Sequence, residues 1–472
     1  MRELLASLAA LALAGALAGC SFAPKYERPA SPVPGEFAGG GAPAVPGAGT
    51  GAGAAAGAAA AADLGWRDVL GDPRLGALIE LALHNNRDLR IAALNVELAR
   101  AAYQIERAGQ LPAVSALGAA EYTGTTDGVG AQYRLGVGVS AFELDLFGRV
   151  RSLAAAALED YLATAAVRRA AHLALVAEVA VQYLIERAAD EQLALAEQTL
   201  ATVGKSVEMT TRLVEAGQRS DLDASTAQAQ LAAARAAVAQ ARRQRAQAAH
   251  ALALLAGQPL PERLPPPQPL EATPFRTALP VGLPSELLQR RPDILAAEHA
   301  LKSANANIGA ARAAFFPSIS LTGFAGLAST ALSRLFTGGA VAWSFAPQVR
   351  VPLFTWGRDR ANLEVARVRT RIEVARYEKA IQVAFREVSD ALVARATLDE
   401  QLEAQTARAA AEQRRFEISE TRYRNGIESY LAVLGAQQDL FASQQQLIEL
   451  RLARLVNVVT LYKALGGGWR ER

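Results

Sequence analysis

The residue types that most often carry catalysis or bind metal ions are few in this chain and do not gather. Its 472 residues include four histidines and one cysteine. The histidines, His84, His172, His250 and His299, stand far apart in segments with helical patterning and lack metal-ligand spacing. The chain has no Walker phosphate-binding loop, no H-E-x-x-H zinc motif and no dinucleotide fingerprint. We therefore expect no enzyme activity, no metal site and no cofactor.

The single cysteine, Cys20, offers another chemistry, covalent lipid attachment. Arg2 precedes an apolar run over residues 4–17, which is too short for a membrane-spanning helix. The run ends in small residues, as a signal peptide does, and the letters LAGC ending at Cys20 resemble the bacterial lipobox. The resemblance implies cleavage before Cys20, acylation of that residue and, with Ser21 following it, delivery to the outer membrane. The alternative is an ordinary signal peptide with an incidental cysteine.

Composition narrows the class of protein further. The net charge is +3 and charged residues make up 20% of the chain, so no strong nucleic-acid-binding field is expected. Long segments are dominated by alanine, leucine, glutamine and arginine, which is typical of extended helices. After the first 20 residues no stretch approaches 18 consecutive uncharged apolar residues, so any membrane crossing must use β-strands.

The chain contains two copies of one unit. Corresponding positions lie 205 or 209 residues apart, as in the pairs Asp88 and Asp293, Pro112 and Pro317, Gly148 and Gly357, Gly217 and Gly426, and Gly257 and Gly466. We divide the chain into a signal peptide (1–19), a lipid-anchored flexible segment (20–62), a first repeat (63–265, with a hairpin at 113–146) and a second repeat (266–472, with a hairpin at 318–354).

Each copy is expected to begin with a helix of about 24 residues, 86–109 or 292–315, followed by two strands. The strands, 113–123, 131–146, 318–328 and 340–354, alternate apolar and polar residues, which fits one apolar face. A soluble sandwich would show the same alternation. Pro347 interrupts the last strand and predicts a bulge or bend there.

Long helices follow each strand pair, over 149–216 and 358–425. At 1.5 Å per residue each spans roughly 100 Å. A returning helix of about 40 residues, 218–257 or 427–466, together with the shorter opening helix, nearly matches that length. Four strands cannot close on themselves, so closure needs several chains, giving eight strands in a dimer or twelve in a trimer.

These segments resemble the TolC/OprM type of outer-membrane efflux proteins over essentially the whole mature chain. The resemblance rests on CSFAPKYERP, WRDVLGDPRLGALIELAL, LLQRRPDILAAE, WSFAPQVRVPLFTWGR and RYRNGIESYLAVLGAQ. It implies a mainly α, TolC-like fold, in which long antiparallel helices form a periplasmic α-barrel. It also implies a 12-stranded membrane β-barrel shared by three chains, with four strands per chain.

The resemblance further implies partners and a passive role. The expected function is the exit duct of a tripartite efflux pump, a homotrimer that docks to a periplasmic adaptor linked to an inner-membrane RND-type transporter. Docking is expected at the periplasmic helix reversals around Gly217 and Gly426, with Arg212 and Arg422 beside them. The alternatives are the outer-membrane channel of a type I protein secretion system and a purely structural periplasmic coiled coil.

The same reversals are expected to hold a gate. The resemblance maps acidic and tyrosine gate positions onto Asp223, Tyr423 and Glu428. Related ducts commonly carry an aspartate where this chain has Gly435, so the gate is expected to rest more on Asp221, Asp223 and Glu428.

Overall fold

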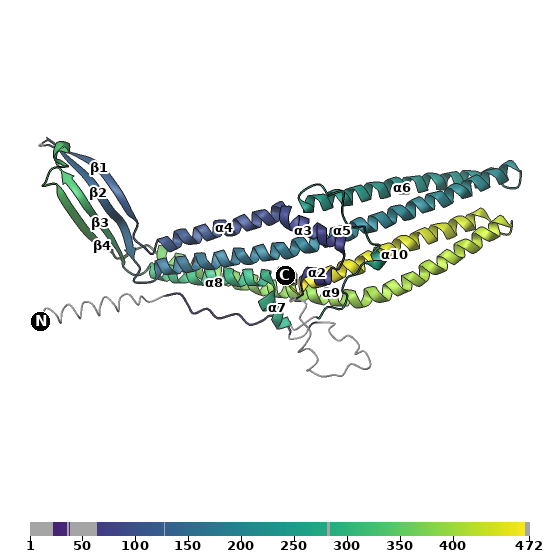
Figure 1. Ribbon diagram of the computed structural model, residues 1–472. Helices are drawn as coiled ribbons and strands as arrows, with labels where there is room; N and C mark the ends of the chain where they lie inside the picture. Colours follow the sequence, from purple (N-terminus) through teal and green to yellow (C-terminus); the bar gives the residue numbers. More distant parts are fainter. Residues whose placement is uncertain (1–21, 35–36, 38–63, 127, 281–283, 468–472) are drawn as a thin grey trace. The chain divides into compact units, whose positions relative to one another are not determined.

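The computed structural model describes residues 22–34, 37, 64–126, 128–280 and 284–467 (Figure 1). The predicted signal peptide (1–19), Cys20 and most of the predicted flexible segment 20–62 lie outside these ranges. The described residues belong to two compact units. Among the described residues, the first unit contains those in 22–31, 94–167 and 293–380, and the second contains those in 32–93, 168–292 and 381–467.

The chain folds into long helices and one four-stranded sheet (Figure 1). The helices are α2 (Trp66–Val69), α3 (Pro73–Asn85), α4 (Arg87–Ala108), α5 (Arg149–Glu215), α6 (Asp221–Ala256), α7 (Pro284–Arg290), α8 (Pro292–Ala313), α9 (Arg358–Arg424) and α10 (Tyr430–Ala464). The strands are β1 (Val114–Thr125), β2 (Gly128–Leu144), β3 (Ser318–Ser329) and β4 (Val341–Arg350), and two 3-10 turns are η2 (Leu270–Ala272) and η3 (Leu332–Arg334). Among the described helices, none combines the length and the apolar character that crossing a membrane requires.

Helix lengths recur between the two halves of the chain. Helices α5 and α9 have 67 residues each, α4 and α8 have 22 each, and α6 and α10 have 36 and 35. The long helices end one residue before the predicted positions. The returning helices are a few residues shorter than predicted, because the turn that reverses the chain uses residues 216–220 and 425–429. The predicted fold class, mainly α with four strands per chain, is confirmed.

The four strands form one antiparallel sheet in the order β1-β2-β3-β4. Pairing places Val137 beside Ala325 and Ala325 beside Trp343, so that these three side chains share one face. The same register aligns Leu135 with Leu327. Alternation in the separate strands therefore combines into one continuous apolar face across the sheet.

That apolar face has no covering layer in the described part of the chain. Val341 and Trp343 are 81% and 79% exposed, and Phe345 and Val137 are also exposed. A soluble sandwich would bury such residues against a second sheet or a helix. The uncovered face therefore argues against the sandwich alternative.

The predicted bulge at Pro347 is wrong. Strands β3 and β4 pair without a shift, and Pro347 lies opposite Leu321. Strand β4 is the edge strand of the sheet, and an edge tolerates a residue without an N–H on its unpaired side. The bulge lies in β2 instead, between Val139 and Phe142, where Ala141 has φ +50°.

Strand β4 is also shorter than predicted. It ends at Arg350, four residues before the predicted end at position 354. Pro352 follows directly in the exit segment, and a proline there cannot donate a ladder hydrogen bond. The segment between Arg350 and α9 therefore leaves the sheet early.

The second unit has a core in which α3 meets α5. Asp72 caps α3 by accepting hydrogen bonds from the backbone N–H groups of Arg74 and Leu75 at 2.8 and 3.2 Å. Its other carboxylate oxygen accepts a hydrogen bond from Tyr183 Oη at 2.8 Å, and Tyr183 is fully buried. Burial, together with that hydrogen bond, raises the pKa of Tyr183. This one carboxylate fixes the start of α3 and its contact with α5.

Candidate functional site

The two helix reversals, residues 216–220 and 425–429, have the same backbone and are called the tips below. Gly217 has φ +69°, its N–H donates to the carbonyl of Val214 at 2.9 Å, and the N–H of Gln218 donates to Leu213 at 2.9 Å. Gly426 has φ +76° and repeats this pattern with bonds of 3.0 and 2.9 Å. This is a Schellman motif, which needs a left-handed residue that glycine supplies without strain.

A small hydrophobic core joins the helices that meet at the tips. It contains Ala227, Phe416, Tyr423, Tyr430, Val433, Ala436 and Leu440, with Val207 and Met209 packed against them. These residues come from the end of α5, the start of α6, the end of α9 and the start of α10. The two tips are therefore tied to each other by side-chain packing.

Tyr423 lies at the centre of this core. Its side chain is only 1% exposed, and its hydroxyl lies 3.4 Å from the hydroxyl of Thr210. The guanidinium of Arg219 lies 4.7 Å from the centre of its ring, and the ring of Tyr430 lies 5.6 Å away. Burial raises the pKa of Tyr430, and the negative charge of Asp223 adds to the effect. Of the predicted gate residues, Tyr423 belongs to this core.

The remaining predicted gate acids take two different positions. Asp221 is exposed in the first turn of α6, where a negative charge interacts favourably with the helix dipole. Ser220 caps this helix by accepting a hydrogen bond from the N–H of Asp223 at 3.3 Å. Glu428 is instead paired with Arg422, whose Nε lies 3.3 Å from a carboxylate oxygen. Sequence position alone did not distinguish Asp221, which lies in a first helical turn, from Glu428, which is ion-paired.

The predicted docking residues remain accessible at the tips. Arg212 donates to Glu208 at 2.6 Å within α5, and both side chains are well exposed. Arg422 is about half exposed despite its pairing with Glu428. Pairs of this kind contribute only about 0.2–1 kcal/mol to stability, so either arginine could exchange its partner at little cost.

The two tips share a backbone, but some of their equivalent side chains differ. At the position where the first tip carries Arg219, the second carries Glu428, and Asp221 of the first corresponds to Tyr430 of the second. Equivalent positions therefore carry opposite charges or exchange an acid for an aromatic ring. Gly435, farther along α10, has open space around it, since a Cβ there would meet no atom within 4 Å.

Sequence reasoning missed three residues of this cluster, Thr210, Arg219 and Tyr430. A usable signal exists for Thr210, which follows the buried residues Val203 and Ser206 at helical spacing and is itself fully buried. Phe416 and Tyr423 are likewise seven residues apart on α9 and buried. Arg219 carries no comparable signal, because its contact with the Tyr423 ring depends on how the turn directs its side chain.

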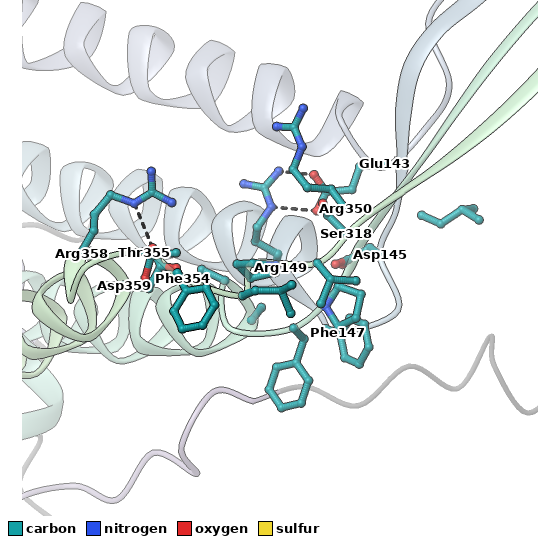
Figure 2. A pocket seen from close by; sticks show the side chains of 18 residues that line it. Glu143, Asp145, Phe147, Arg149, Ser318, Arg350, Phe354, Thr355, Arg358 and Asp359 are labelled. Atoms are coloured by element: carbon teal, nitrogen blue, oxygen red, sulfur yellow. Dashed lines mark hydrogen bonds and ion pairs between the residues drawn. The ribbon is translucent and has the colours of Figure 1, made fainter.

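A cavity of about 850 Å³ lies where the strands of the first unit meet its helices (Figure 2). The three carboxylates that line it already accept hydrogen bonds from neighbouring groups. Glu143 accepts from Arg149 at 2.8 Å, Asp359 accepts from Arg358 at 3.0 Å, and Asp145 caps α5 by accepting two backbone hydrogen bonds. The contacts of Glu143 and Asp145 anchor the end of β2 to the start of α5, whereas the Arg358–Asp359 contact lies within the first turn of α9. None of the three carboxylates is held ready as a general acid or base. In the described part of the chain, no group of three or more His, Cys, Asp or Glu residues could hold a metal ion.

Comparison with known protein families gives one match that covers most of the chain. The family is described as outer membrane efflux protein, and it matches residues 78–258 and 283–467. The two matched segments fall on either side of the connection between α6 and α7. This chain is thus similar to the family in both of its halves.

Curated relatives are similar over nearly their whole length. The antibiotic efflux pump outer membrane protein ArpC of Pseudomonas putida is 46% identical, with 100% of this chain and 97% of ArpC aligned. The toluene efflux pump outer membrane protein TtgC of the same species has the same identity and coverage. The cation efflux system protein CusC of Escherichia coli is 41% identical over 97% of both chains.

Solved structures give the same result for the fold. The open state of the Neisseria gonorrhoeae MtrE outer membrane channel matches with a TM-score of 0.85 and 42% identity, covering 96% of this chain and 99% of that one. A crystal structure of CusC matches with a TM-score of 0.83 and 39% identity, covering 95% and 100%.

The tip glycines make a matched pair of substitutions possible. We expect Gly426→Ala to destabilise its tip by about 1 kcal/mol, because a side chain disfavours the left-handed conformation. Gly435→Ala should instead stabilise α10 by about 0.5–1 kcal/mol, because its site is helical and open. Hydrogen exchange measures both effects: the amides of the tip report the destabilisation, and the amides of α10 report the stabilisation. Equal exchange in the two variants would show that the left-handed turn does not limit the tip.

Proposed function

The chain belongs to the outer membrane efflux protein family, and from this membership we propose that it forms the exit duct of a tripartite efflux pump. The duct conducts small molecules passively from a periplasmic adaptor and an inner-membrane RND-type transporter to the exterior. The names of its relatives, which include antibiotic, toluene and cation efflux proteins, support small-molecule efflux over type I protein secretion. Substrate choice then rests with the partner transporter.

The observation that carries this proposal is the incomplete sheet. Its apolar face is uncovered in the described residues, and β1 and β4 each pair on one side only within the chain. In lipid, an apolar face is stable, but an unpaired strand edge is not. A homotrimer satisfies both conditions, because three copies give a closed twelve-stranded barrel whose apolar face meets the outer membrane.

The tips supply the proposed gate and docking surface. We assign the gate to Asp221, Asp223, Tyr423 and Glu428, which are drawn together when three copies converge. Acids brought together at close range attract cations, and we assign to Asp223 and Tyr423 the role of holding the closed end shut. An adaptor would contact the tips at Gly217 and Gly426, with Arg212 and Arg422 as exchangeable charged partners.

Cys20 supplies the proposed membrane anchor. The lipobox motif predicts acyl chains on this residue, and each buried methylene adds about 0.8 kcal/mol of membrane affinity. The outer-membrane assignment of the relatives is consistent with this destination.

A pair of neighbouring substitutions in β4 tests the proposed function. Trp343→Arg places a charge on the apolar face and should cost about 2–4 kcal/mol per copy in lipid. Ser344→Arg places the same charge on the opposite face and should be tolerated. In a strain lacking the native gene, we expect Ser344→Arg, but not Trp343→Arg, to restore low accumulation of a fluorescent efflux dye. Equal complementation by both variants would contradict a lipid-facing role for this side of the sheet.

Planar-bilayer recording tests the gate. We expect Asp223→Ala and Tyr423→Phe to raise the closed-state conductance, because each removes a polar group that we assign to the closed gate. The first removes the carboxylate whose charge acts on Tyr430, and the second removes the hydroxyl that lies 3.4 Å from that of Thr210. Glu208→Ala serves as the control, since Glu208 is an exposed residue of α5 whose ion pair lies within that helix. Unchanged conductance in the first two variants would exclude these residues from the gate.

A further inference from the structure

The charged residues of the four described strands all lie on one face of the sheet, opposite the apolar face. They are Glu121, Arg134, Glu143 and Arg350. Residues two apart on a strand share a face, and the pairing of the strands carries this face across the sheet. We call it the polar face. Glu143 and Arg350 stand at the end of the polar face that leads into the helices.

Near that end lies the cavity of about 850 Å³ between strands and helices. The acids among its described lining residues each have an arginine partner, in the pairs Glu143–Arg149 at 2.5 Å, Asp145–Arg151 at 3.2 Å and Asp359–Arg358 at 3.0 Å. Opposite charges at such distances largely cancel beyond their immediate surroundings. The paired groups therefore give the cavity little net charge.

Arg350 is the remaining cation of the cavity lining. It is exposed, and its guanidinium forms no hydrogen bond or ion pair with any other residue that the structure describes. Figure 2 shows Arg350 among the lining residues, and no dashed line joins its side chain to another of them. A guanidinium carries five N–H donors and a permanent positive charge. The cavity thus holds one positive charge that no acid of its described lining neutralises.

Two hydroxyl groups and an aromatic ring line the cavity together with Arg350. Ser318 lies directly opposite Arg350 in the pairing of β3 with β4, and Thr355 lies in the segment that leads into α9. Within the described residues, neither hydroxyl has a hydrogen-bond partner, so both can donate to an anion. The ring of Phe354, also labelled in Figure 2, is 89% exposed. These groups suit a ligand with an anionic end and an apolar body.

We propose that the cavity beside Arg350 binds the anionic group of transported small molecules, a carboxylate or sulfonate carried on an aromatic or apolar body. The inference rests on the proposed function, because the polar face lines the water-filled interior of a duct only when the apolar face meets lipid. Three copies then place three Arg350 guanidinium groups around one path. A ring of arginines attracts anions.

The exposure of Arg350 sets the strength of this binding. Attraction between an anion and a guanidinium in water is screened by salt, so the site holds its ligand weakly. A conducting path requires such weak binding, because a solute must leave the site as well as enter it. The site therefore enriches anionic solutes at this end of the duct without trapping them.

Fluorescence anisotropy of a trisulfonated pyrene dye, titrated with the purified full-length protein in uncharged detergent at low salt, tests the site. We expect the wild type to bind the dye, and Arg350→Gln to weaken binding by about tenfold because it removes charge-assisted hydrogen bonds. Arg350→Lys keeps the charge and should bind within about threefold of the wild type. Arg134→Gln is the matched control. It removes an arginine of the same polar face that donates to Gln132 and does not line the cavity, so binding should be unchanged.

Absence of binding to the wild type, or equal binding by the wild type and a folded Arg350→Gln protein, would overturn the proposal. Where circular dichroism shows that Arg350→Gln does not fold, salt decides with the wild type alone. Affinity should fall as salt rises, and the same affinity at low and high salt would show that charge does not hold the dye.

Complementation with an uncharged fluorescent efflux dye separates the site from the duct. In a strain lacking the native gene, we expect the wild-type chain and Arg134→Gln to restore low accumulation of this dye. A wild-type chain that fails to do so would contradict the proposed duct. A wild-type chain that complements but does not bind the sulfonated dye would contradict the anion site alone.

Discussion

The constraint on which the rest depends is a sheet that is incomplete within one chain. Four strands carry a continuous apolar face that the described residues leave uncovered, and each outer strand has an edge without a partner in the chain. Water disfavours the face, and lipid disfavours the edges. The sheet of a single copy is therefore unfavourable in water because of its apolar face and in lipid because of its unpaired edges. Association of several copies in a membrane resolves both problems at once.

The two halves of the chain repeat the same helices and turns but differ in the side chains at the tips. Both halves use long helices of 67 residues and a Schellman turn with a left-handed glycine. The side chains at the two tips nevertheless differ, because Arg219 and Glu428 occupy equivalent positions. A duplicated backbone thus produces an asymmetric cluster around Tyr423. The contacts of such a cluster can be favourable in one arrangement of the four helices and unfavourable in another. The proposed gate depends on a difference of this kind.

The fold was largely predictable from the sequence, because its signals are local and occur twice. Periodicity identified the helices and strands, and recurring glycines at fixed spacing located the reversals. The error at Pro347 had a physical reason. The sequence of β4 does not reveal that it is the edge strand, where proline needs no bulge.

The site was less predictable, since it depends on contacts between distant segments. The Thr210–Tyr423 contact joins residues 213 apart. Residue types at single positions cannot reveal such partners. Exposed acids in a first helical turn, such as Asp221, also look alike whether they only stabilise the helix or act in a gate.

The most direct test of the central claim is the molecular mass of the mature protein, measured by sedimentation in detergent and in detergent-free buffer, with circular dichroism on the same samples. We expect a mass of about three chains in detergent, with both helix and strand signal, and aggregation when detergent is removed. A well-ordered monomer in plain buffer that retains its strand signal would contradict the claim, because its sheet would then be complete within one chain.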